Sequence, residues 1–455
     1  MKNKEYEMDM CSGGIFGKLV ALTIPLMLSG MLQLLFNAVD IVVVGNFGSE
    51  NSVAAVGNTT ALINLMTNLF LGMSVGANVL VSRYVGAREG KKANDVIHTS
   101  LMLGIICGVF LSAVGLLFGE PILKIMQTPD DVIKLSALYI KIYFMGMPAM
   151  MVYNFGSSIL RSKGDTKRPL YYLTFAGIAN ALLNLFFCIV LKMDVAGVAL
   201  ASVISQFMSA LLILRCLSKE NETFKFEFKK LKITPHTAAS VLRIGIPAGL
   251  QGVVFSLSNV VIQSSINEFG SVVMAGNAAA ASIEGFVWTA MNAFSQTALT
   301  FVGQNIGRGK YSRINRIAFT ALLCSTVTGL VLGNLACLFG PQLLSIYDPR
   351  PEIIEPGMTR MRIVCGFYFF CGLMDCMVGS IRGMGYAVTP TVVSLLGACG
   401  LRILWIFTVF RIPEYHTQKM LFYSYPMSWA ITFTVHLICF IIMRKRLPKE
   451  DAANS

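Results

Sequence analysis

Charged residues are scarce in this sequence. They make up 13% of its 455 residues, whereas soluble globular domains contain about 25%. Hydrophobic residues account for 55% of the chain, and the mean hydropathy is +0.65. Runs of the roughly 20 apolar residues that a helix needs to cross a bilayer recur along the whole length. This composition predicts a polytopic membrane protein and leaves no room for a sizeable soluble catalytic domain.

The motifs that mark enzymes and metal sites are also missing. The eleven cysteines form no CxxC pair, and the four histidines show no ligand spacing. The sequence contains no phosphate-binding Walker loop and no HExxH. A GxSxG match at 72–76 lies within an apolar run, whereas a nucleophilic serine needs a strand, a turn and a helix. We therefore expect no enzyme, no metal centre and no cofactor, and we expect an ion gradient to supply the energy for any transport.

Twelve segments have the length and hydropathy of membrane-spanning helices. Residues 1–17 precede them and lack the pattern of a secretory signal, so the first span is expected to stay in the protein. The predicted fold class is an all-α polytopic membrane protein with twelve transmembrane helices. The spans lie near 18–43, 53–77, 96–118, 132–157, 169–191, 196–215, 240–263, 275–302, 317–339, 359–382, 390–411 and 421–443.

Positive charges fall mainly on one side of these spans. With the N-terminus inside, 27 of the 37 Lys and Arg residues lie in cytoplasmic segments and 8 in outer segments. This asymmetry is the positive-inside bias, and it predicts that both termini are cytoplasmic. Topology thus explains the net charge of +13, and we expect no nucleic-acid partner.

The chain repeats one pattern twice. At an offset of 221 residues, "SSILRSKGDTKRP" (157–169) aligns without a gap with "VGSIRGMGYAVTP" (378–390). "YVGAREGKK" (84–92) resembles "NIGRGKYSR" (305–313). Each copy holds six spans, an even number, which predicts parallel repeats, as in transporters whose lobes rock about a central cavity. The predicted domains are the N-terminal segment 1–17, the N-lobe 18–215, the inter-lobe loop 216–237, the C-lobe 238–443 and a basic tail 444–455.

Polar residues follow one face of the first span. They recur every three or four residues, which forms a stripe on a helix, and Pro25 lies one turn earlier, where it allows a bend. Because a polar group in hydrocarbon needs a partner or a wet cavity, we expect a polar pocket around Asp40. The stripe consists of Ser29, Gln33, Asn37 and Asp40, and the candidate partners are Asn64, Asn68, Asn154, Asn180, Asn184, Ser202 and Gln206.

Two alternatives stay open for this pocket. Single Asn, Gln or Ser residues in a span more often join helices than bind ligands. Lys141, near the outer end of its span, could reach Asp40 and pair with it. Without that pair, the amides and hydroxyls around Asp40 suit a carboxylate that gains and loses a proton or holds a cation.

The second lobe carries its own polar set. Glu284 and Arg402 each lie nine residues from the outer end of their spans, roughly 13–14 Å deep. A structural ion pair between them is therefore one interpretation, and a cation site at Glu284 and Asp375 is the other. The remaining polar residues of this lobe are Gln251, Asn259, Gln263, Asn277, Trp288, Asn292 and Gln296.

Seven stretches within about residues 15–445 have a recognisable order and spacing: "IPLMLSGMLQLLFNAVDIVVVGNFG", "SRYVGAREGKKAND", "SILRSKGDTKRP", "GVALASVISQ", "IPAGLQG", "FVGQNIGRGK" and "SIRGMG". In these stretches the chain resembles bacterial members of the multidrug and toxic compound extrusion (MATE) family. The resemblance implies two pseudo-symmetric six-helix lobes around a V-shaped central cleft. We expect a monomer in the bacterial inner membrane, although the sequence does not settle the oligomeric state. It implies antiport of H⁺ or Na⁺ against cationic, amphipathic drugs or toxic metabolites.

The resemblance also implies roles for individual residues. Asp40 matches the first-helix acid whose protonation or ion binding bends the span at Pro25. The sequence departs from many members at Asn184, where they have Asp, and this weakens the case for a tight Na⁺ site. The N-lobe coupling set is Asp40, Asn180, Asn184, Ser202 and Asn154; the alternative C-lobe acids are Glu284 and Asp375; the predicted cleft lining is Gln33, Asn37, Gln251 and Asn259.

A flippase for lipid-linked precursors, from the same superfamily, is the alternative function. Such proteins are similar in their repeat but tend to line the cleft with basic residues. The predicted spans hold three acids and one Arg as cleft candidates, which favours the exporter. The sequence leaves open the coupling ion and the lobe that binds it.

Overall fold

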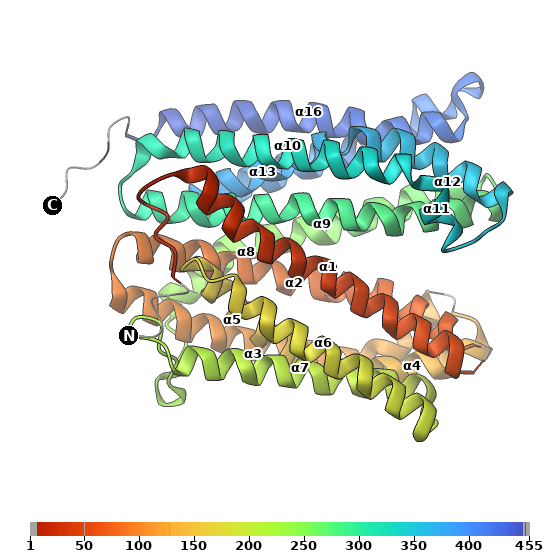
Figure 1. Ribbon diagram of the computed structural model, residues 1–455, viewed down its shortest axis with the longest axis horizontal. Helices are drawn as coiled ribbons and strands as arrows, with labels where there is room; N and C mark the ends of the chain where they lie inside the picture. Colours follow the sequence, from red (N-terminus) through yellow and green to blue (C-terminus); the bar gives the residue numbers. More distant parts are fainter. Residues whose placement is uncertain (1–6, 50, 127, 449–450, 452–455) are drawn as a thin grey trace. The chain divides into compact units, whose positions relative to one another are not determined.

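The computed structural model describes residues 7–49, 51–126, 128–448 and 451, and over these residues it contains helices and no strands. The predicted all-α fold class is confirmed. Residues 1–6 of the predicted N-terminal segment, and 449–450 and 452–455 of the predicted tail, lie outside the described residues. The first helices, shown in Figure 1, are α1 (Ile15–Phe47), α2 (Ser52–Gly86), α3 (Gly90–Ile125), α4 (Asp130–Phe144), α5 (Met147–Ser162), α6 (Lys167–Leu185) and α7 (Asp194–Ser218).

The second half of the chain follows a similar order of long and broken helices. A π-helical segment, η6 (Leu395–Gly400), joins two short helices into one span, just as η2 (Phe186–Val190) extends α6. The helices are α8 (Pro235–Asn267), α9 (Ser271–Gly307), α10 (Ile314–Leu338), α11 (Gly340–Ser345), α12 (Pro351–Val364), α13 (Phe369–Gly383), α14 (Val388–Ser394), α15 (Leu401–Phe407) and α16 (Gln418–Lys445).

The lengths of these helices agree with a multi-pass membrane protein. Within the described ranges, 9 helices are long and apolar enough to cross a membrane, and two bent pairs raise the number to 11. The pairs are α4 with α5, bent by 49°, and α12 with α13, bent by 45°. Helix α9 is not among these 11 candidates. It has 37 residues, which is long enough, but it carries many polar side chains. Each of the twelve predicted spans therefore coincides with a helix or a broken helix.

The chain divides into two compact units. The first comprises Met1–Asp9 and Met31–Gly249, and the second comprises Met10–Gly30 and Leu250–Ser455. The division falls within α1, five residues after Pro25, and within α8, shortly after Pro247. Helix α1 therefore contributes its beginning to the second unit and its remainder, including Asp40, to the first.

The backbone repeats as the sequence predicts. Gly164 follows α5 with φ +92°, and Gly385, 221 residues later, follows α13 with φ +93°. Arg88 before α3 has φ +59°, and its counterpart Gly309 has φ +72°. Positive φ is common for glycine and uncommon for other residues, so the left-handed Arg88 at the position that matches Gly309 indicates that the two halves share this turn.

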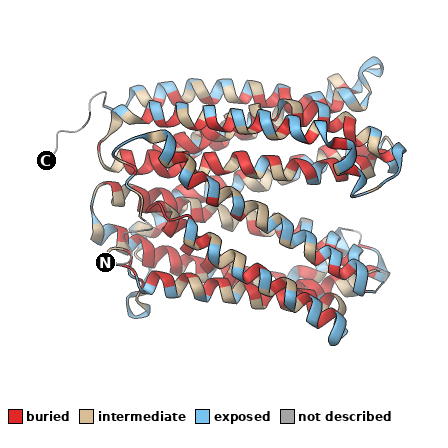
Figure 2. Ribbon diagram, viewed as in Figure 1, coloured by how far each residue is buried: buried red, intermediate tan, exposed pale blue. Residues whose placement is uncertain are grey.

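Apolar side chains fill the interior of each unit and also cover much of its outside. The first unit has a core cluster that includes Leu111, Ile140 and Phe144, and the second has one that includes Met291, Phe410 and Phe422. Figure 2 shows exposed residues along the outer faces of the long helices, and many of them are large and apolar. Such a surface is expected where lipid, rather than water, is the solvent.

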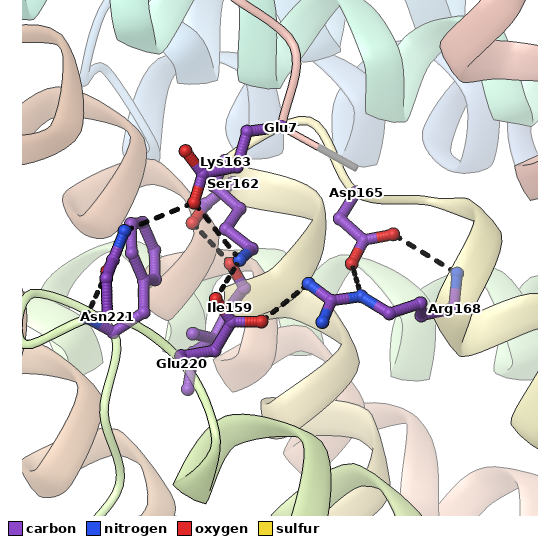
Figure 3. A network of polar contacts seen from close by, with 9 residues as sticks. Glu7, Ile159, Ser162, Lys163, Asp165, Arg168, Glu220 and Asn221 are labelled. Carbon is purple, nitrogen blue, oxygen red and sulfur yellow. Dashed lines mark hydrogen bonds and ion pairs between the residues drawn. The ribbon is translucent and has the colours of Figure 1, made fainter. Parts of the chain in front are cut away.

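A network of buried charges holds the turn between α5 and α6 in the first unit (Figure 3). Glu220, two residues after α7, accepts a hydrogen bond from Lys163 Nζ at 2.6 Å and forms an ion pair with Arg168 Nη2, also at 2.6 Å. Arg168 also pairs with Asp165. Glu7 approaches Lys163 at 3.5 Å, and the backbone N–H of Met8 donates to the Lys163 carbonyl. The repeated "SKGDTKRP" turn is thus joined to the N-terminal segment and to the start of the inter-lobe loop.

Candidate functional site

Asp40 is buried in the first unit, where helices α1, α6 and α7 meet. Its exposed fraction is 9%. Asn184 Nδ2 of α6 donates to Asp40 Oδ1 at 2.5 Å, and Ser202 Oγ of α7 donates to Asp40 Oδ2 at 3.4 Å. Both carboxylate oxygens therefore face neutral hydrogen-bond donors, which replace part of the water that a buried carboxylate loses.

Asn180 completes this polar cluster. It lies one turn before Asn184 on α6 and accepts from Asn184 Nδ2 at 3.2 Å, while its own Nδ2 lies 3.3 Å from Ser202 Oγ. With its amide turned over, Asn180 Nδ2 would donate to Asp40 Oδ1 at 3.0 Å. Asn184 Oδ1 is buried and has no hydrogen-bond partner among the described residues. In that orientation two amide groups, those of Asn180 and Asn184, would donate to Asp40 Oδ1.

A cavity of about 200 Å³ opens beside this cluster. Asp40, Asn180 and Ser202 line it, together with Asn37 from the predicted polar stripe. Tyr139 and Tyr143 of α4 line it as well, with their rings 5.7 Å apart. The sequence pattern did not single out the two tyrosines, because the search for polar groups in the spans followed charged, amide and hydroxyl-methyl residues, although the spacing of four residues places both rings on one face of α4.

Two predicted neighbours of Asp40 lie elsewhere. Lys141 pairs with Glu120 at 3.3 Å on an exposed surface. The predicted ion pair between Lys141 and Asp40 is therefore not among the contacts of the described residues. Asn154 donates to the carbonyl of Met150, one turn earlier on its own helix, and it is not among the residues that line the cavity. Gln33 is exposed and also lies outside that lining.

Glu284 in the second unit forms an ion pair, but its partner is Arg360 and not Arg402. Arg360 Nε and Nη2 bind the two carboxylate oxygens at 2.7 and 2.6 Å. Arg360 Nη1 donates to Asn277 Oδ1 at 2.6 Å. The sequence placed Arg360 at the outer end of a span that began near residue 359. Helix α12 begins at Pro351, which places Arg360 inside the helix, where it is 6% exposed.

Arg402 lies in an aromatic setting of the same unit. Its guanidinium carbon is 4.3 Å from the centroid of Tyr425 and 5.3 Å from that of Trp429. Its Nε donates to Ser428 Oγ at 2.9 Å. Cation–π contacts of this kind stabilise a guanidinium without a carboxylate, which explains how Arg402 is accommodated although Glu284 is bound elsewhere.

Asp375 is the second predicted acid of this unit. Asn292 and Trp288 of α9 donate side-chain hydrogen bonds to it. Gln251 accepts from Arg382 Nη2 at 2.7 Å, and Asn259 is exposed. Glu284 and Asp375 thus have separate partners, and only Asp375 resembles Asp40 in being held by neutral donors.

The chemistry available at Asp40 is that of a single carboxylate. Among the described residues, no group of three or more His, Cys, Asp or Glu could hold a metal ion. Asn184 and Ser202 present hydrogen-bond donors to Asp40, and Asp40 is the single carboxylate in this polar cluster.

Comparison with solved structures defines the fold. A MATE protein in complex with MaL6 aligns with a TM-score of 0.90, covering 97% of this chain and 99% of that one at 20% identity. The fold is therefore the two-lobe fold of these transporters.

The sequence comparisons identify the family. The MatE family model matches residues 25–189 and 247–408, which is most of the chain, so the protein belongs to the MatE family of multidrug efflux transporters. It is 27% identical over 418 residues to the probable multidrug resistance protein YoeA of Bacillus subtilis, covering 90% of each chain. It is 25% identical over 397 residues to the probable multidrug resistance protein NorM of Thermotoga maritima, covering 85% of this chain and 84% of that one. These relationships favour the exporter over the lipid-linked precursor flippase.

Proposed function

We propose that this protein is a proton-coupled exporter of cationic, amphipathic drugs or toxic metabolites in the bacterial inner membrane, with both termini cytoplasmic. Family membership and the names of the relatives support export of drugs. The environment of Asp40 is the observation that supports a role for this residue in proton coupling. It is a buried carboxylate that two neutral side chains hold and that lines a cavity.

Protonation of Asp40 would change its hydrogen bonding. An ionised carboxylate only accepts hydrogen bonds, whereas a protonated one also donates. The unpartnered Asn184 Oδ1 could accept that new hydrogen bond after the amide rotates. The N–H group of Asn184 would then turn away from Asp40. A hydrogen bond from Asp40 to Asn184 Oδ1 would replace the present one from Asn184 Nδ2 to Asp40, and it would join α1 to α6 in a different geometry.

The link matters because α1 belongs to both compact units. Thr23, near its start, bonds to Thr297 of the second unit at 2.9 Å, and Asp40 bonds to α6 and α7 of the first. Pro25 lies between them and lacks the N–H group that would complete the helix ladder. We infer that a change at Asp40 alters the bend of α1, and that the lobes 18–215 and 238–443 respond by alternating access.

The substrate enters this scheme through competition with the proton. A ligand shifts a conformational equilibrium only by its different affinity for the two states. A cationic drug near an ionised Asp40 is attracted, and a neutral Asp40 no longer attracts it. Tyr139 and Tyr143 supply aromatic faces beside the carboxylate, and such faces bind organic cations.

The test is transport by inverted membrane vesicles that contain the full-length protein. A fluorescent lipophilic cation such as ethidium is added outside, and an acidic lumen or a Na⁺-loaded lumen is imposed separately. We expect uptake with the acidic lumen, little uptake with Na⁺ alone, and loss of uptake in Asp40→Asn. The matched control is Asp375→Asn, which removes a carboxylate held by neutral donors in the other unit and should retain most of the uptake.

Other outcomes would redirect the proposal. Uptake that is driven by Na⁺ and survives Asp40→Asn would move the ion site to the second unit. Failure of every gradient to drive uptake, with folded protein in the vesicles, would remove the support for a drug exporter.

A further inference from the structure

A groove in the second unit has no part in the proposed coupling site. It lies where α1 and α10 begin, at the end of the molecule where the N-terminal segment enters α1 (Figure 1). Its volume is about 510 Å³, and it is lined by Gly13, Gly14, Asn315, Thr320 and two arginines, Arg313 and Arg316, among others. None of the lining residues is acidic. A groove with two arginines and no carboxylate is suited to an anion.

The two arginines differ in how their guanidinium groups are held. Arg313 Nη2 donates to the carbonyls of Ser12 and Gly13 at 3.4 and 3.0 Å, which fixes its guanidinium, and its buried Nε has no partner among the described residues. Arg316 is exposed, and its side chain takes part in no ion pair that the described residues form. Asp451 of the C-terminal tail bonds to Ser312 and does not line the groove, but it lies close enough to Arg313 to offset part of its charge. The charge of Arg316 therefore remains available to a ligand.

The helix starts add to this positive potential. Neither α1 nor α10 has an acidic residue in its first turn. The first N–H groups of a helix lack intrahelical partners and carry partial positive charge. The groove thus combines two side-chain cations with two helix ends of the same sign.

An apolar stripe leads away from the groove along α10. It begins at Phe319, which lines the groove and is 67% exposed. The following members recur every four residues, so each lies next to the one before it in a ridge that winds slowly around the helix. They are the exposed residues Leu323, Val327, Val331 and Leu335. A cationic groove that continues into an apolar stripe complements a phosphate headgroup joined to an acyl chain. A small soluble anion would make no contact with the stripe.

We propose that this groove binds the headgroup phosphate of an anionic glycerophospholipid, with an acyl chain along the α10 stripe. The predicted orientation places both helix starts at the cytoplasmic surface. Basic pockets between membrane helices on this side are suited to anionic headgroups. The site is independent of Asp40, which lies in the other unit.

The test is lipid binding to the purified full-length protein, followed by native mass spectrometry. The probes are phosphatidylglycerol, phosphatidylcholine of the same chain length, and two soluble competitors, inorganic phosphate and glycerophosphoglycerol. The variant Arg316→Gln removes one charge from the groove without breaking a described ion pair. The matched control is Arg243→Gln, an exposed arginine near the start of another span. We expect one tightly held phosphatidylglycerol in wild type and control, and roughly fivefold weaker retention in Arg316→Gln.

Three results would overturn the proposal. Arg316→Gln could hold phosphatidylglycerol as well as the wild type does. The control could lose it equally, which would show only general attraction to charge. Inorganic phosphate or glycerophosphoglycerol could displace the lipid at equal concentration, which would make the groove a site for a soluble anion.

Discussion

Asn184 donates to Asp40 at 2.5 Å and thereby joins α6 to the carboxylate on α1. Many family members are expected to have Asp where this chain has Asn184. A second carboxylate at this distance would repel an ionised Asp40 unless a cation or a proton lay between them. The amide therefore allows this pocket to keep a single negative charge.

Asn184→Asp should create Na⁺ dependence. The substitution replaces the amide nitrogen by a second oxygen ligand and adds a second charge beside Asp40, and both changes favour a hard cation. We expect drug uptake by inverted vesicles to become stimulated by luminal Na⁺, with the response to an acidic lumen reduced. Asn184→Ser, which adds no charge, is the control. Unchanged ion preference in Asn184→Asp would mean that this pocket does not select the coupling ion.

The Glu284–Arg360 pair should contribute to stability and leave ion selection unchanged. Glu284→Gln leaves Arg360 buried beside a neutral amide, and breaking a buried ion pair costs about 3–5 kcal/mol. We expect a clearly lower thermal unfolding temperature in detergent. The double variant Glu284→Gln/Arg360→Gln should recover part of the loss, because no unpaired charge remains.

Glu352→Gln is the matched control for that pair. Its carboxylate lies on the same α12 helix and is 64% exposed, so its removal should change stability little. If Glu284→Gln were as stable as the wild type but had lost its response to the ion gradient, Glu284 would be a coupling residue instead.

Gly164→Ala should destabilise the α5–α6 turn. Gly164 has φ +92°, and a Cβ added there would lie 2.8 Å from the Cβ of Met8. Holding a non-glycine residue in such a conformation costs on the order of 1–3 kcal/mol. Unfolding in detergent should show this loss, whereas Gly366→Ala, where a Cβ meets nothing within 4 Å, should behave almost as wild type. Equal effects of the two substitutions would contradict the assigned turn.

Glu220→Gln should loosen the same turn from the opposite side. The Glu220 side chain is fully buried between Lys163 and Arg168. Its neutralisation leaves Arg168 with Asp165 and leaves Lys163 with the more distant Glu7. We expect faster amide hydrogen exchange in residues 163–166 and a lower unfolding temperature. Glu222→Gln, two residues away and exposed, provides the control. Unaltered exchange in Glu220→Gln would show that the network does not hold the turn.

Much of the fold could be predicted because hydrocarbon imposes simple rules. A backbone in lipid must satisfy its own hydrogen bonds, so long apolar runs predict helices. The repeat could be predicted because matching glycines mark matching turns, as at Gly164 and Gly385. The polar cluster of Asp40, Asn180, Asn184 and Ser202 could be predicted because a polar group in a span needs partners.

The sequence by itself therefore determined the class of protein, the repeat and the residue types around Asp40. Only the tertiary structure decided which charges meet. Lys141 pairs with Glu120, and Glu284 pairs with Arg360 instead of Arg402. The depth of a residue in the membrane follows from its distance along the sequence to the end of its span. The partner of a charge depends on where each helix begins and how it is rotated against its neighbours, and packing of the whole unit sets both.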